Sequence, residues 1–157
     1  MYLVTGGAGF IGSAFLAELN ARGVTDIVVV DQLDSSEKWK NLSSKRFVDY
    51  LHKDQLIERI EHNRPLPKFS ALIHLGACSS TTERDAEYMM QNNYRFSRQL
   101  AEWALERKLR MIYASSAATY GNGDAGFSDD DETAKRLIPL NVYAFSKQMF
   151  DLWAIQT

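Results

Sequence analysis

The chain has 157 residues, of which 45% are hydrophobic and 24% are charged, as in an ordinary globular domain. Its net charge of −2 argues against a nucleic-acid binder that relies on a basic face, and no run approaches the ~20 apolar residues that a membrane span needs. We therefore expect no nucleic acid and no membrane among its partners. The single cysteine, Cys78, excludes an internal disulfide and favours an intracellular protein. The three histidines lack metal-ligand spacing, so no metal site is predicted.

Short apolar runs alternate with stretches of helical periodicity along the chain. Residues 2–5 lead into glycines, as a buried parallel strand does, and residues 27–31 form a β-branched run that ends in an acid. The expected strands are 2–5, 27–31, 71–75 and 109–114, and the expected helices are 11–22, 51–60, 82–108 and one that opens at Asn141. This order predicts an α/β fold, a Rossmann-type doubly wound parallel sheet with strand order 3-2-1-4 and helices on both faces.

A glycine-rich segment joins the first strand to the first helix. Gly6, Gly9 and Gly12 have the G-x-x-G-x-x-G spacing. Glycines allow a tight turn, a close approach of the backbone to a pyrophosphate and close packing of helix on strand, and the phosphates then lie at the positive end of the helix dipole. Because this segment lies between a strand and an amphipathic helix, it predicts a dinucleotide site rather than an ordinary glycine turn.

Asp31 and two lysines bear on the identity of the dinucleotide. Asp31 follows Gly12 by nineteen positions, close to the ~20 expected for the acid that binds an adenosine ribose. A bare aspartate there favours NAD because it repels a 2′-phosphate, but Lys38 and Lys40 follow in the loop and could supply the opposite charge. The residues alone leave NAD and NADP open.

The last predicted helix reaches Thr157 without a glycine or proline to end it. A doubly wound nucleotide-binding fold has further strands beyond this point. We therefore expect residues 1–157 to form one incomplete dinucleotide-binding Rossmann domain, with a C-terminal substrate domain absent. A complete four-stranded domain is the less favoured alternative.

Tyr143 and Lys147 form a Y-x-x-x-K pattern on the last predicted helix. Residues four apart share a helix face, and an ammonium beside a phenol favours the phenolate, the form that acts as a general base. Lys147 can also hydrogen-bond the ribose of a nicotinamide. Ser116 follows the strand at 109–114, and parallel sheets bind ligands at the carboxyl ends of their strands. The order of these residues predicts a serine, tyrosine and lysine catalytic set.

These motifs, in this order, resemble the extended short-chain dehydrogenase/reductase family. Within that family the amino-acid sequence is similar to that of the ADP-L-glycero-D-manno-heptose 6-epimerases in the stretches 74–83, 88–94, 113–121 and 139–143. The resemblance runs over residues 1–157 apart from the segment 121–138, and it covers about half of a family member.

The resemblance implies a cytoplasmic isomerase with tightly held NADP, which makes residues 1–157 its NADP-binding Rossmann domain. The implied reaction interconverts ADP-D-glycero-D-manno-heptose and ADP-L-glycero-D-manno-heptose by oxidising C6″ to a ketone and returning the hydride to the other face. Such enzymes serve the biosynthesis of the lipopolysaccharide inner core and form ring-like homo-oligomers.

The resemblance also assigns roles to residues. It implies that Lys38 is the partner of the 2′-phosphate, and that Ser116, Tyr143 and Lys147 form the catalytic triad. The implied cofactor contacts are Gly6, Gly9, Phe10, Ile11, Gly12, Asp31, Gln32, Lys38, Lys53, Leu75, Gly76, Ala77, Cys78, Ser79, Asn92 and Lys147. Family members carry their substrate residues and a second base beyond the position of Thr157, so residues 1–157 alone are expected to be inactive.

Two other functions stay open. The first is another nucleotide-sugar epimerase or a dehydratase of the same family. A dehydratase commonly has an acid pair after the threonine that follows the serine strand, whereas Tyr120 and Gly121 follow Thr119. The second is a non-catalytic NAD(P)-binding regulator. Such proteins tend to lose the tyrosine or the lysine, and both Tyr143 and Lys147 are present.

Overall fold

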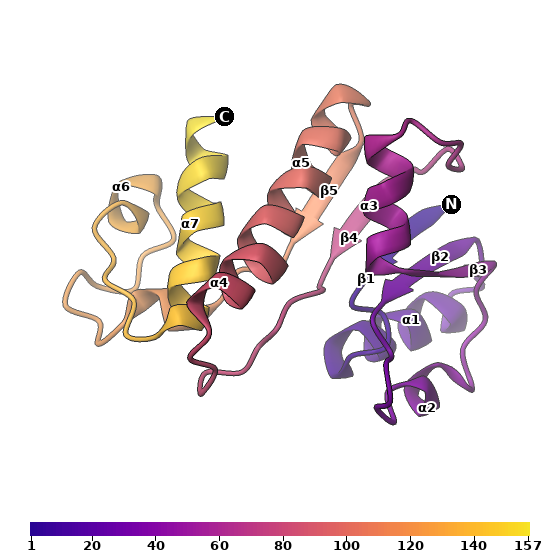
Figure 1. Cartoon of the computed structure of the whole chain (residues 1–157), viewed down its shortest axis with the longest axis horizontal. Coiled ribbons are helices and arrows are strands. Elements are labelled where there is room, and N and C mark those ends of the chain that lie inside the picture. The colour runs from indigo at the N-terminus through magenta and orange to yellow at the C-terminus, as the bar shows by residue number, and fades with distance from the viewer. The chain divides into compact units, whose positions relative to one another are not determined.

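The computed structural model describes all of residues 1–157 and divides the chain into two compact units (Figure 1). Unit 1 consists of Met1–Gly76 and Gln99–Tyr113, and unit 2 consists of Ala77–Arg98 and Ala114–Thr157. Each unit is described by itself. None of the helices in either unit combines the length and the apolar character that crossing a membrane requires.

Unit 1 contains a five-stranded parallel sheet. Its strands are β1 (Tyr2–Thr5), β2 (Ile27–Asp31), β3 (Asp49–His52), β4 (Ala71–His74) and β5 (Arg110–Tyr113). The sheet order is β3-β2-β1-β4-β5, and every neighbouring pair is parallel. This order is that of a doubly wound Rossmann-type sheet, which confirms the predicted fold class.

β3 is a strand that the sequence pattern does not predict, and the expected helix start at Leu51 is wrong. Leu51 is the one buried residue of β3, so the strand shows no apolar alternation, and it forms through backbone pairing with β2 at the edge of the sheet. Helix α3 (Lys53–Glu61) begins directly after it. The order 3-2-1-4 holds only once β3 is counted, and β5 extends it. With 71–75 taken as the third strand, the prediction places that strand beside residues 27–31, which is wrong, because it pairs with β1 and β3 pairs with β2. The strand at 71–74, counted third from the sequence, is therefore the fourth.

Helices cover both faces of the sheet in unit 1. Right-handed crossovers place α1 (Phe10–Ala21) and α2 (Trp39–Leu42) on one face, and α3 and the Gln99–Glu106 part of α5 (Phe96–Glu106) on the other. The core on the α1 face is built from buried residues of β1, β2, β4, the glycine loop and the two helices: Val4, Ala8, Leu16, Ile27, Val29, Leu42, Ala71 and Ile73. Alternate strand residues such as Leu3, Val28 and Leu72 are also buried, so both faces are apolar, as a parallel sheet requires.

Unit 2 is built around α7 (Val142–Gln156), which contacts four other helical elements. These are α4 (Ala86–Met89), the π-helix η1 (Met90–Arg95), the 3₁₀-helix η2 (Ala117–Tyr120) and α6 (Asp131–Ala134). The predicted start of α7 is confirmed, since the Asn141 side chain accepts a 2.8 Å hydrogen bond from the Ala144 amide. A single helix over 82–108 is wrong, because the helix begins at Ala86 and passes through η1 before α5.

Candidate functional site

The glycine loop of unit 1 is shaped by close contacts that a side chain would prevent. Gly6 has φ +70°, and a Cβ built there would lie 2.6 Å from the Gly76 amide nitrogen. A Cβ at Gly12 would lie only 2.1 Å from the Gly6 carbonyl oxygen. At Gly9 the same carbonyl would lie 3.2 Å away. The first and third glycines of the motif are therefore required by backbone packing, and the middle one is less constrained.

The amino end of α1 has the properties of an anion site. Gly9 caps the helix without a side-chain hydrogen bond, and the first turn carries no acidic residue. Its first amides therefore have no intrahelical acceptor, and no acidic side chain of the first turn offsets the helix dipole. Phe10 and Ile11, which begin the helix, are 89% and 66% exposed. A phosphate at this end would meet backbone N–H groups and two exposed apolar side chains.

Asp31, at the carboxyl end of β2, is buried and fixes the glycine loop. Its Oδ2 accepts a 2.8 Å hydrogen bond from the Ala8 amide, and its Oδ1 accepts one of 2.7 Å from the Gln32 amide. Asn41 holds the same loop from the other side, since its amide nitrogen donates to the Ala8 carbonyl at 2.8 Å. The sequence patterns do not identify Asn41, which lies 33 positions from Ala8.

The two lysines after β2 occupy different places. The Lys38 ammonium lies 3.0 Å from Asp31 Oδ1 and donates to the Gln32 carbonyl at 3.1 Å, while nearly half of its side chain remains exposed. Lys40 forms a 2.7 Å ion pair with Glu37 instead. Of the two, Lys38 is the lysine that lies beside the ribose-binding candidate and neutralises its charge.

Three further cofactor candidates lie in unit 1 at the same edge of the sheet. Lys53 follows the carboxyl end of β3, and its ammonium is 3.6 Å from Asp54 Oδ1. Leu75 and Gly76 follow β4 and lie against β1, where the Leu75 amide donates to the Thr5 carbonyl and the Gly76 amide to the Thr5 hydroxyl. The carboxyl ends of parallel strands meet at one edge, so these residues and the glycine loop share it.

Unit 2 contains a buried asparagine that the sequence patterns do not identify. Asn93 is 1% exposed and lies in η1. Its side chain accepts a 2.8 Å hydrogen bond from the Cys78 amide, donates to the Cys78 carbonyl at 3.0 Å and donates to the Ser146 hydroxyl at 3.0 Å. Asn93 thus joins the Ala77–Ser79 segment to α7. The π-helix that contains it is visible only in the structure, and such π-helical turns are frequent at functional sites.

Two predicted cofactor residues, Asn92 and Ser79, are the chain neighbours of the two residues that form this bridge, Asn93 and Cys78. Asn92 is half-buried and donates to Asn93 Oδ1 at 3.1 Å, and Ser79 is exposed. Ala77 and Cys78 are half-buried. Of these four predicted residues, Cys78 and Asn92 are bonded directly to the Asn93 side chain.

Replacing Asn93 by alanine is expected to lower the free energy of unfolding by about 1–3 kcal/mol, because both backbone groups of Cys78 lose their partner in a buried place. Urea denaturation measures the change. Gln91→Ala is the matched control, since Gln91 is exposed on the same helical segment. An Asn93→Ala protein as stable as the control would show that the bridge does not hold unit 2 together.

The three predicted catalytic residues lie on two adjacent elements of unit 2. Ser116 caps η2, and its hydroxyl accepts a 3.2 Å hydrogen bond from the Ala118 amide. Tyr143 and Lys147 are one turn apart on α7, and η2 contacts α7. The Lys147 ammonium donates to the Ala114 carbonyl at 2.8 Å. Lys147 is thereby tied to the segment that leads to Ser116.

Lys147 has an unusual environment for a lysine, being 4% exposed. Burial lowers the pKa of its ammonium to about 8, and the nearby charge of Asp151 acts in the opposite direction. Near neutral pH the group remains mostly protonated but can lose its proton more readily than a solvated lysine. Such a group can hold a hydroxyl and assist proton transfer beside Tyr143.

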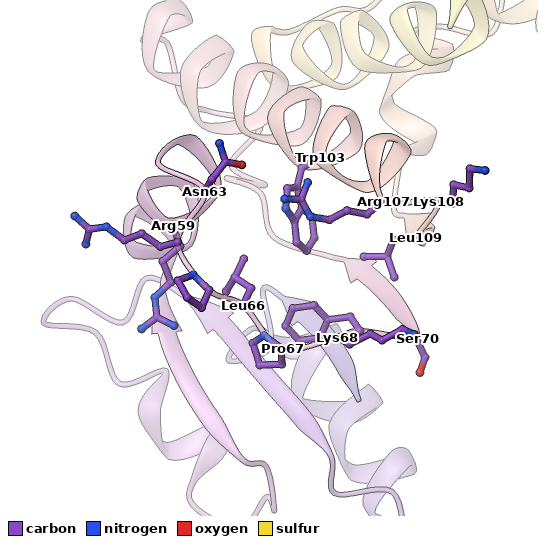
Figure 2. Close-up of a pocket in the computed structure, with 13 residues that line it drawn as sticks. Arg59, Asn63, Leu66, Pro67, Lys68, Ser70, Trp103, Arg107, Lys108 and Leu109 are labelled. Atoms are coloured by element: carbon purple, nitrogen blue, oxygen red, sulfur yellow. The ribbon is translucent and has the colours of Figure 1, made fainter.

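A pocket of 590 Å³ in unit 1 lies away from the glycine loop (Figure 2). Ser70 and Leu109 in its lining directly precede β4 and β5, so the pocket lies at the amino ends of these strands. The glycine loop follows the carboxyl end of β1 in the same parallel sheet, which is the opposite edge. Arg59 and Lys108 point to opposite sides in Figure 2, so these cations do not converge on one ligand.

Comparisons with known proteins agree with this arrangement of motifs. Residues 2–157 match the family described as NAD dependent epimerase/dehydratase. The chain is 58% identical over 154 residues to an ADP-L-glycero-D-manno-heptose-6-epimerase of Nitratidesulfovibrio vulgaris (strain DP4), covering 98% of this chain and 48% of that protein. It spans about half the length of the curated relatives it matches.

Solved structures of the same class have the same fold. The ADP-L-glycero-D-manno-heptose-6-epimerase of Helicobacter pylori superposes with a TM-score of 0.81 at 31% identity, covering 99% of this chain and 50% of that one. The UDP-Glc/GlcNAc 4-epimerase of Campylobacter jejuni does so with a TM-score of 0.80 at 25% identity, covering 99% and 48%. With a family match over nearly its whole length, the chain belongs to the NAD dependent epimerase/dehydratase family.

Proposed function

We propose that this chain is the cofactor-binding and proton-transferring half of an epimerase that acts on ADP-glycero-manno-heptose at C6″. The observation that carries the proposal is the setting of Lys147, which is buried, one turn from Tyr143 and bonded to the segment before Ser116. The 58% identity to a relative named for this reaction supports the choice of substrate.

The glycine loop of unit 1 suits the pyrophosphate of a nicotinamide dinucleotide. Bare backbone at Gly6 and Gly12 and the uncapped amino end of α1 would receive the phosphates, and Asp31 would receive the adenosine ribose. The family description, NAD dependent, supports a nicotinamide cofactor of either form. The position of Lys38 against Asp31 favours NADP, because it cancels the charge that would repel a 2′-phosphate.

Replacing Lys38 by alanine is expected to weaken NADP binding about five- to a hundredfold, since a partly desolvated charge-assisted contact contributes about 1–3 kcal/mol, while NAD binding changes little. Isothermal titration with both dinucleotides measures the difference. Lys40→Ala is the matched control, because Lys40 is already paired with Glu37. Equal losses for NADP and NAD would rule out a role of Lys38 at the 2′-phosphate.

Unit 2 would supply the first proton transfer. A nicotinamide dinucleotide, when bound, would supply the acceptance of the hydride and its return to the opposite face, which inverts C6″. Tyr143 would take the proton from the C6″ hydroxyl as the ketone forms, and the second base that the resemblance implies in the other half of the protein would supply the proton when the alcohol is restored. Ser116 would donate a hydrogen bond to the same oxygen, and the Lys147 ammonium would favour the phenolate of Tyr143.

The experiment that tests the proposal is a chimera. Residues 1–157 replace the matching half of the Nitratidesulfovibrio vulgaris relative and are joined to the rest of that protein. High identity over the exchanged half favours a folded chimera. We expect it to bind NADP and to convert ADP-D-glycero-D-manno-heptose to the L-glycero epimer, with the relative itself as the reference. A folded, NADP-loaded chimera without conversion would contradict the proposed function.

A further inference from the structure

Two hydrogen bonds from one face of α7 hold consecutive residues just before Ser116. Lys147 Nζ donates to the Ala114 carbonyl at 2.8 Å, and Asp151 Oδ2 accepts a 2.5 Å hydrogen bond from the Ser115 hydroxyl. Lys147 and Asp151 are four positions apart and therefore project from the same side of the helix. All of these residues belong to unit 2.

These bonds restrict where Ser116 can lie. Ser116 has an extended backbone, with φ −153° and ψ 138°, and begins η2 through hydrogen bonds from the Ala118 amide to its hydroxyl and from the Thr119 amide to its carbonyl. The segment before Ser116 is thus bonded to α7, and η2 after it packs on α7. Ser116 is held between two fixed points on the helix that carries Tyr143.

Asp151 also acts on Lys147 through its charge. Burial raises the pKa of the Asp151 carboxyl, while the Ser115 hydrogen bond and the Lys147 ammonium lower it. The groups near Asp151 are Lys147 on α7, Tyr120 on η2, and Asp129 and Asp131, which line the same 570 Å³ pocket as Ser115 and Ser116. A short hydrogen bond to a carboxylate is the strong, directional kind.

We propose that Asp151 is a positioning residue, which fixes Ser116 through Ser115 and supports the charged form of Lys147 beside Tyr143. The catalytic use of this positioning rests on the proposed function. The hydrogen bonds of Asp151 and Lys147 are present in the chain itself. A carboxylate is required because it must accept from Ser115 and also offset a buried ammonium. An amide in its place accepts the hydrogen bond but carries no charge.

The test uses the 157-residue chain and follows two signals by NMR. The lysine ε-methylene resonances, with Lys147→Arg to assign the signal of Lys147, report its titration. The amides of Ala118 and Thr119 report the order around Ser116 through hydrogen exchange. The variants are Asp151→Asn, which removes the charge, and Ser115→Ala, which removes the hydrogen bond and keeps the charge. Asp129→Asn is the matched control within the same pocket.

We expect Lys147 to titrate near pH 8 in the unaltered chain and about half a pH unit or more lower in Asp151→Asn, because an opposite charge is lost. In Ser115→Ala, Lys147 should still titrate near pH 8. Hydrogen exchange at the Ala118 and Thr119 amides should become about tenfold or more faster, because a loss of about 1.4 kcal/mol in the free energy of local opening is a factor of ten. Asp129→Asn should change neither signal.

An unchanged Lys147 titration in Asp151→Asn, or unchanged exchange in Ser115→Ala, would overturn the proposal. Because neither signal involves dinucleotide or sugar, both can hold even if the chimera fails to epimerise. Conversely, an active chimera with unchanged signals would overturn the role of Asp151 alone.

Discussion

Replacing Gly12 by alanine is expected to reduce dinucleotide binding about a hundredfold or more, a loss of about 2.8 kcal/mol at about 1.4 kcal/mol per tenfold. A Cβ at this position would lie 2.1 Å from the Gly6 carbonyl oxygen and 2.8 Å from the Gly7 Cα. Both neighbours are backbone, so the loop itself must move. The displaced peptide groups are those expected to face the pyrophosphate, and isothermal titration with NADP measures the loss.

Gly9→Ala separates this effect from a general penalty for side chains in the loop. Its Cβ would lie 3.2 Å from the same carbonyl, which a shift of a few tenths of an ångström relieves. We expect less than about a tenfold loss of affinity for this variant. Circular dichroism and thermal unfolding show whether both variants are folded. Normal NADP binding by folded Gly12→Ala would contradict the phosphate-loop assignment.

Replacing Tyr143 by phenylalanine is expected to reduce turnover of the chimera about a hundredfold or more, because the change removes the proton-transfer group and keeps the ring. Tyr143 is half-buried on α7, so the loss of one hydroxyl should leave the fold and NADP binding intact. Conversion of ADP-D-glycero-D-manno-heptose, followed by NMR of the product at saturating substrate, measures turnover.

Tyr88→Phe is the control for this substitution, because Tyr88 is an exposed tyrosine on α4 of the same unit. It should convert substrate at the unaltered rate. Ser116→Ala should lose less turnover than Tyr143→Phe, since Ser116 orients the substrate oxygen without transferring its proton. Near-normal conversion by Tyr143→Phe would contradict the general-base assignment.

Local sequence patterns were sufficient to predict the elements that depend on short-range interactions. The strand, glycine loop and helix at residues 2–21 follow from apolar runs and from glycine spacing, and Asn141 is a cap that short-range chemistry dictates. β3 was missed because an edge strand with one buried side chain has no alternation to detect. The π-helix η1 was missed because its i→i+5 bonds leave the helical pattern of the sequence intact.

The candidate site was predictable to a similar degree. Spacing and order along the chain predict Ser116, Tyr143 and Lys147 as candidates, and the structure has them on the adjacent elements η2 and α7. Asn93 and Asp151 were not identified, because their contacts join residues 15 to 53 positions apart. Such contacts depend on where α7 packs, which no local pattern specifies.

The most direct test of the central claim is to run the chimera's conversion in D₂O and to examine C6″ of the product. A hydride that moves to the nicotinamide and returns never mixes with solvent, whereas epimerisation by removing and replacing a proton at carbon takes deuterium from water. We predict an L-glycero product without deuterium at C6″. Deuterium at C6″ in the converted product would contradict the oxidation and reduction that the glycine loop, Tyr143 and Lys147 are proposed to perform.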